Sequence, residues 1–74
     1  MINKTFKNAT SAAVKICKQR KAELRKVVIL EWYGDSGLFG IEYVTKDEKY
    51  HYIEFNVGQN PNEYEVLENT EKEI

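Results

Sequence analysis

The fold of this chain is decided by residues 27–57, which read VVILEWYGDSGLFGIEYVTKDEKYHYIEFNV. Bulky apolar and aromatic residues alternate with other residues in three runs, and a period of two is typical of β-strands. The runs cover residues 27–33, 38–44 and 50–57. They are separated by polar segments of hairpin length, at 34–37 and 45–49. The stretch therefore predicts three antiparallel strands joined as a meander.

The same residues predict how the strands pair, because a shift by one residue would exchange the two faces of the sheet. If Phe39 is opposite Phe55 across the second turn and opposite Trp32 across the first, the bulky apolar residues share one face. Val28 and Leu30 then lie on that face too, because they are four and two residues before Trp32. We therefore expect Trp32 to be a central core residue.

The segment before the strands has the period of a helix. From Phe6 to Leu24 the apolar residues recur at helical spacing along one stripe, with lysines on the opposite side. Arg20 projects from the middle of this stripe, so it extends past the core or meets a carboxylate. An amphipathic helix of this kind can cover the apolar face of a sheet.

The predicted fold class is α+β, with the N-terminal amphipathic helix packed on one face of an antiparallel three- to four-stranded β-meander. Residues 1–67 form one small domain, and it stays open whether 63–67 add a fourth strand. Residues 68–74 are polar and are expected to be a frayed tail. The order of helix and meander resembles cystatin-like and PepSY-type domains, the latter associated with peptidase inhibition. This resemblance is one of topology and carries no function across.

Charge is divided unevenly along the chain. Residues 1–26 hold eight basic residues against one acidic residue, a net +7, whereas residues 27–74 hold three against eleven, a net −8. Such an asymmetry predicts either a basic binding face or two halves that attract each other.

The bulk composition limits the location of the protein. Cys17 is the single cysteine among 74 residues, so the chain cannot form an internal disulfide. No run is apolar enough for a membrane span or a secretory signal. We therefore expect a cytoplasmic protein without a membrane partner.

Chemistry-bearing residues are few. The segment Gly34-Asp35-Ser36-Gly37 has the four letters that surround the nucleophilic serine of trypsin-like proteases, but the one histidine, His51, follows the serine instead of preceding it. Aspartate, serine and glycine are also what a hairpin turn selects. We expect no catalytic residue, no metal ligand, no cofactor and no enzymatic activity.

Two surfaces remain as candidates for binding. The predicted outer sheet face, the one away from the helix, is rich in tyrosine and favours a protein partner or a homodimer. Its residues are Tyr33, Tyr50, Tyr52, Ile29, Leu38 and Val44. The alternative is a nucleic-acid-associated protein that contacts phosphates through the basic face of the helix. Those residues are Lys7, Lys15, Lys18 and Arg25. On the sheet face protein contact is preferred to nucleic acid, because Glu31, Glu42 and Glu54 share that face and would repel phosphates. The first hypothesis, a small interaction or regulatory module, is preferred overall, because the basic helix face is also explained as a solvated surface that balances the acidic sheet.

Overall fold

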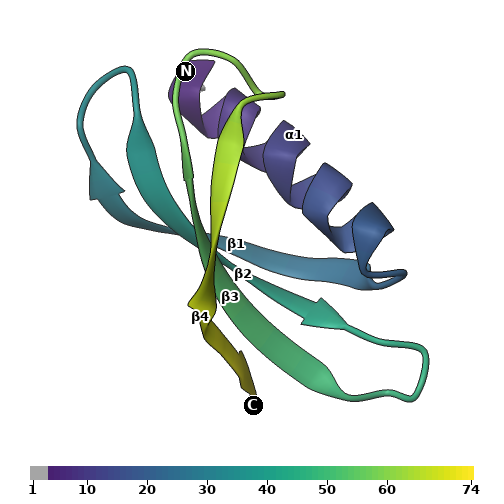
Figure 1. Cartoon of the computed structure of the whole chain (residues 1–74). Coiled ribbons are helices and arrows are strands. Elements are labelled where there is room, and N and C mark those ends of the chain that lie inside the picture. Colours follow the sequence, from purple (N-terminus) through teal and green to yellow (C-terminus); the bar gives the residue numbers. More distant parts are fainter. Residues whose placement is uncertain (1–3) are drawn as a thin grey trace.

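The computed structural model describes residues 4–74. Within these residues one helix, α1 (Lys4–Gln19), precedes β1 (Glu23–Trp32), β2 (Gly37–Val44), β3 (Tyr50–Val57) and β4 (Tyr64–Glu73). The strands form one antiparallel sheet in the order β1-β2-β3-β4, and α1 lies across one of its faces (Figure 1). The predicted α+β fold is confirmed. Within the described part of the chain, α1 is too short and too polar to cross a membrane.

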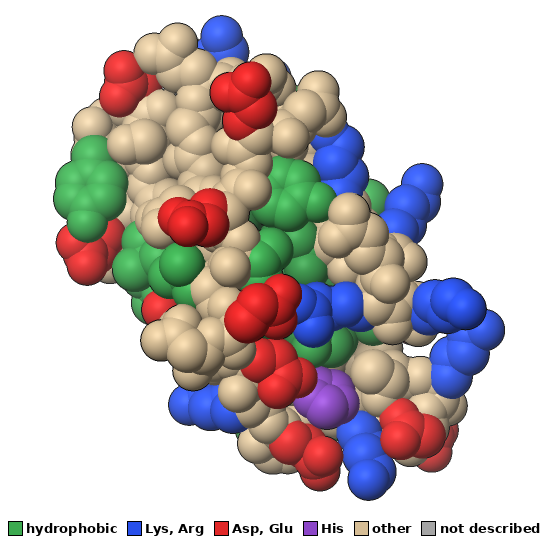
Figure 2. Space-filling model, in the orientation of Figure 1, with side chains coloured by type: hydrophobic (Ala, Val, Ile, Leu, Met, Phe, Trp, Pro, Cys, Tyr) green, Lys and Arg blue, Asp and Glu red, His purple; other side chains and the backbone are tan. Residues whose placement is uncertain are grey.

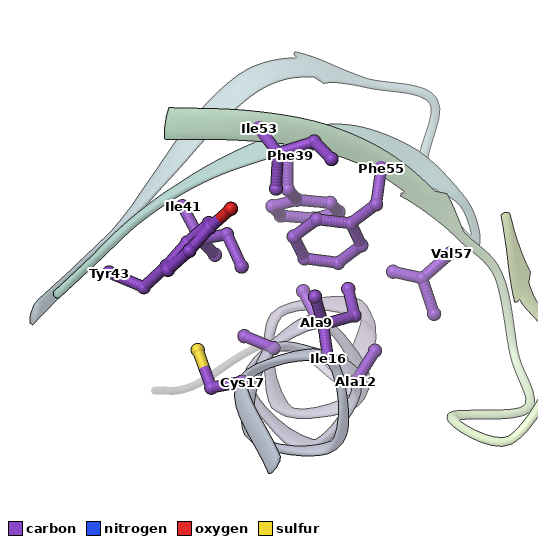
Figure 3. Packing of buried hydrophobic residues seen from close by; sticks show 11 residues of the cluster. Ala9, Ala12, Ile16, Cys17, Phe39, Ile41, Tyr43, Ile53, Phe55 and Val57 are labelled. Atoms are coloured by element: carbon purple, nitrogen blue, oxygen red, sulfur yellow. The ribbon is translucent and has the colours of Figure 1, made fainter. Parts of the chain in front are cut away.

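The central pair of strands has the predicted register. Phe39 is opposite Phe55 and Ile41 is opposite Ile53, so both pairs face the helix. The two phenylalanine rings are stacked with their centroids 5.9 Å apart. Figure 3 shows these side chains pointing from the sheet toward α1, where they form the centre of the core together with Ile16.

The helix meets the sheet through small side chains. Ala9, Ala12 and Ala13 are completely buried, and together they let the helix backbone approach the sheet closely (Figure 3). Ile16 and Cys17 continue the same stripe one turn further along. The lone cysteine is therefore a packing residue, and burial raises the pKa of its thiol.

Two polar residues of α1 are buried as well, and both bind loops at the same end of the sheet. The Thr5 hydroxyl donates a hydrogen bond to the carbonyl of Gly34 (2.8 Å). The Asn8 amide nitrogen donates to the carbonyls of Gly58 (3.0 Å) and Gln59 (2.7 Å). The start of α1 is thus tied to both the β1–β2 and the β3–β4 connections.

The predicted register of β1 is wrong, because Trp32 is opposite Gly37 instead of Phe39 and because the strand contains two β-bulges. The regular pairing with β2 is interrupted at Arg25 and again at Leu30. Each bulge adds one residue to β1 only, so the alternation of faces shifts at that point. As a result Ile29, predicted on the outer sheet face, is opposite Phe39 and lies on the helix side.

The prediction that Trp32 is a central core residue is also wrong, although the residue lies on the predicted face. Trp32 is opposite Gly37 at the end of β1, and 55% of its surface is exposed. Leu30 is exposed at its bulge, and Val28 is opposite Gly40 on the outer face. The place predicted for Leu30, opposite Ile41, is taken by Val27.

The predicted frayed tail is wrong for residues 68–73. They belong to β4, where Lys72 is opposite Tyr52 and Glu73 is opposite His51. The pairing is irregular between Leu67 and Lys72, where the Thr70 hydroxyl accepts a hydrogen bond from the backbone N–H of Glu54 (2.8 Å). The segment is ordered despite its polarity, because an edge strand can carry mostly solvated side chains. The fourth strand is present and longer than 63–67.

Candidate functional site

Five of the six residues predicted for the outer sheet face lie on that face. Leu38 and Val44 are half-buried on β2, and Val44 is opposite Tyr50. Tyr50 is exposed at the start of β3. The hydroxyl of Tyr33, just beyond β1, donates a hydrogen bond to the outer-face carboxylate of Glu31. The fifth residue is Tyr52, and the sixth, Ile29, faces the helix side as described above.

Tyr52 is held in place by its neighbours within the sheet. Its ring covers Gly40, where an added Cβ atom would lie 2.5 Å from the tyrosine hydroxyl oxygen. That hydroxyl donates to Glu54 Oε2 (3.1 Å), and Lys72 Nζ lies 5.3 Å from the ring centroid. Burial, and then the hydrogen bond to Glu54, raise the pKa of Tyr52 to about 12. Tyr52 therefore offers a partner less free surface than the sequence suggested.

The exposed apolar residues concentrate at one end of the edge strand β1. Four of them follow one another within five positions, and they are between 41% and 61% exposed. We call this set the β1 apolar edge: Ile29, Leu30, Trp32 and Tyr33. Figure 2 shows apolar side chains (green) protruding at the left, where β1 ends in Figure 1.

The β1 apolar edge continues onto the helix. Ile29 and Trp32 line a small apolar cavity of about 30 Å³ together with Phe6 of α1. Trp32 is oriented there by its indole nitrogen, which donates to the carbonyl of Gly34 (2.7 Å). Sequence reasoning missed this set because it placed Leu30 and Trp32 in the core.

Three of the four predicted phosphate contacts lie together. Lys7, Lys15 and Lys18 line a shallow, open groove along the solvent side of α1. Lys15 also donates a hydrogen bond to the side chain of Asn62 in the β3–β4 connection. Arg25 is elsewhere: its guanidinium lies 5.9 Å from the ring centroid of Tyr50, beside β1 and β3. The structure thus does not place Arg25 with the lysines.

A polar cluster near the end of α1 was only partly predicted. Arg20 binds both carboxylate oxygens of Glu68 at 3.0 Å, as expected for a residue meeting a carboxylate. The Tyr43 hydroxyl donates to Glu71 Oε1 (3.1 Å), and Nδ1 of His51 lies 3.2 Å from the same oxygen. Figure 2 shows the histidine (purple) beside carboxylates (red). These contacts fix residues 68–71 against the core, so we assign the cluster a structural role.

Ser36 and His51, the two residues considered for catalysis, lie far apart. Ser36 lies next to Gly37, which is opposite Val57, whereas His51 is opposite Tyr43. His51 and Val57 are six positions apart along β3, a distance of about 20 Å. Among residues 4–74 no group of three histidine, cysteine or carboxylate side chains is arranged to hold a metal ion.

Comparison with known proteins supplies no family. No protein-family model, no curated protein and no solved structure matches the chain. The likeness to cystatin-like and PepSY-type domains stays a resemblance of topology, and the function is to be inferred from the surfaces of this chain.

Proposed function

We propose that this protein is a small interaction module, not an enzyme, which binds another protein or a second copy of itself through the sheet. The observation that carries the proposal is the β1 apolar edge, which includes Tyr33 of the outer sheet face. Apolar residues exposed singly are ordinary on protein surfaces, but a contiguous group marks an interaction site. Tryptophan and tyrosine are also the residues that most often dominate binding energy at interfaces.

The position of these residues on an edge strand supports the same proposal. Within residues 4–74, β1 has a neighbour only on one side, in β2, so its other side presents unpaired backbone groups. A protein segment can bind such an edge by adding a strand, with side-chain contacts supplying specificity. Glu42 and Glu54 are half-buried on β2 and β3, which makes the centre of the outer face less apolar than the β1 end.

Replacing Leu30 and Trp32 together with glutamate should abolish partner binding while the protein stays folded, because both side chains are largely exposed. Affinity purification from the native cell with mass spectrometry would identify partners. Each partner is then purified, and its affinity for the wild type and for the variant is measured. Binding should weaken by about 100-fold or more, as for the loss of a central aromatic residue.

The matched control is Tyr50→Glu, which places a carboxylate on the outer sheet face without altering the β1 apolar edge. Circular dichroism verifies the fold of each variant. Unchanged binding by the Leu30/Trp32 variant would contradict the proposal for β1, and selective loss in Tyr50→Glu would move the interface to the outer sheet face.

Nucleic-acid binding is the second candidate function, and it is favoured by the shared groove of Lys7, Lys15 and Lys18. Changing all three to glutamine should weaken binding of DNA or RNA equally for all sequences and reduce its salt dependence. The control changes three other lysines, Lys21, Lys46 and Lys49, and keeps the net charge equal. No retention of the wild type on polyanions at low salt would exclude this function.

A cytoplasmic location is part of the proposal. Cys17 is a free, buried thiol, which suits a reducing compartment where disulfides do not form.

A further inference from the structure

We infer that the β1 apolar edge binds a second copy of this chain, and that the two β1 strands pair antiparallel to join both sheets into one. This inference rests on the proposed function, because it names the occupant of the same surface. It is carried by the pattern of faces along β1, which matches itself when the strand is reversed.

The faces of β1 follow from its pairing with β2. Leu24, Val27, Ile29 and Trp32 are opposite helix-side positions of β2, and Lys26, Val28 and Glu31 are opposite outer-face positions. Glu23 is opposite Val44, also on the outer face, and the last two residues, Arg25 and Leu30, are the bulges. The bulges lie three residues before and two residues after Val28.

An antiparallel pair requires that opposed residues share a face. With Val28 of one copy opposite Val28 of the other, Val27 is opposite Ile29, and both are on the helix side. Beyond them Lys26 is opposite Glu31, and both are on the outer face. Every opposed pair therefore agrees in its face.

The outermost pair agrees as well, because the bulges compensate. In one copy the segment from Leu24 to Val27 contains the bulge at Arg25. The segment opposite it in the other copy, from Ile29 to Trp32, contains the bulge at Leu30. Each strand then contains the same number of residues, and Leu24 and Trp32 meet on the helix side. Registers centred on Val27 or on Ile29 also match the faces, but they oppose Val28 with Lys26 or with Glu31 and form no ion pair across the seam. The Lys26–Glu31 pairs thus select the register centred on Val28.

The chemistry of the pairs is complementary too. Two-fold symmetry makes each contact occur twice, so the seam holds two Lys26–Glu31 ion pairs on its outer face. On the helix side it covers Ile29 and Trp32, which are among the most exposed apolar residues of the isolated chain. Both helices lie on the same face of the joined sheet, and Phe6, which lines the cavity with Trp32, is turned toward the seam. An apolar centre with a charged rim is typical of a stable interface.

Charge reversal tests the register. In sedimentation equilibrium from micromolar to near-millimolar concentration, the wild type should be a dimer. Lys26→Glu and Glu31→Lys should each raise the dimer dissociation constant about tenfold or more, because each creates two like-charge pairs. The double reversal should return it to within about threefold of the wild type. Lys46→Glu, in the exposed β2–β3 turn, is the control and should change nothing.

Because Lys26 also faces Glu42 in its own chain, thermal unfolding is measured alongside to separate stability from association. A second test is Val28→Cys, which should form a disulfide between copies on mild oxidation, whereas Glu42→Cys on the central strand β2 should not.

A monomer at all concentrations would overturn the inference, and the charges and bulges of β1 would then protect the edge. The proposed function would survive that result if a different protein still required Leu30 and Trp32. The β1 pairing would also be overturned if neither charge reversal changed the dimer dissociation constant. The same conclusion would follow if the Tyr50→Glu variant sedimented as a monomer.

Discussion

Phe55→Ala should unfold this protein, whereas Trp32→Ala should leave it folded. Phe55 is completely buried and stacks on Phe39, with helix α1 covering both rings. Truncating a buried phenylalanine costs about 3–5 kcal/mol, because the lost transfer free energy adds to that of the cavity. A chain of this length has a free energy of unfolding of roughly 4–11 kcal/mol, so the substitution removes much or all of it.

Trp32 is larger than Phe55 but more than half exposed, and its contacts border a small cavity at the end of β1. Its truncation should therefore cost about 1 kcal/mol, as for a partly exposed side chain. Urea denaturation followed by far-ultraviolet circular dichroism compares the two variants without relying on tryptophan fluorescence. If Trp32→Ala lost as much stability as Phe55→Ala, the bulged register of β1 would be wrong.

The contrast between these aromatic residues also shows where sequence reasoning succeeds. In β2 and β3, every second residue is a large apolar one, and the pairing of these two strands contains no bulge. Alternation alone then decides both face and register. The α+β class followed from the same alternation and from the helical spacing of the apolar residues before it.

Sequence reasoning fails in β1 for a physical reason. Residues 27–30 are all apolar, so they carry no alternation from which a face could be assigned. A bulge at Leu30 then exchanges the face of Ile29 relative to a regular strand, so that Ile29 shares the helix side with Trp32. The candidate interaction surface depends on that exchange, and it could not be located without the pairing of the backbone.

The C-terminal strand was missed for a different reason. Residues 68–73 have almost no apolar side chains, and hydrophobic patterning is blind to a strand that backbone pairing and ionic contacts stabilise. The sequence predicted that Arg20 could meet a carboxylate but did not indicate which one. The partner is Glu68, which lies in this segment. The basic lysines of the helix could be grouped from helical spacing, but Arg25 could not, since it lies past the end of α1.

Asn8→Asp should destabilise the protein by about 2–4 kcal/mol at neutral pH, although the two side chains have nearly the same shape. Asn8 is buried, and its amide nitrogen donates to the carbonyls of Gly58 and Gln59. A carboxylate there would present an acceptor to two acceptors in a poorly solvated site. The hydrogen bonds would be lost and a repulsive contact would replace them.

The pH dependence separates this charge effect from the loss of hydrogen bonds. Burial beside two carbonyls raises the pKa of the introduced carboxyl group in the folded state above its value in the unfolded chain. The variant is then most stable, relative to the wild type, below the unfolded pKa, and it loses that stability as the pH rises through the folded pKa. Asn8→Ala removes the same donor without adding charge, so its cost of about 1–2 kcal/mol should not change with pH. Urea denaturation of the three proteins from acidic to neutral pH measures both effects. If the two variants lost equal stability at every pH, Asn8 would not be held against the β3–β4 connection as the structure shows, because a carboxylate facing solvent would be neither repelled nor protonated.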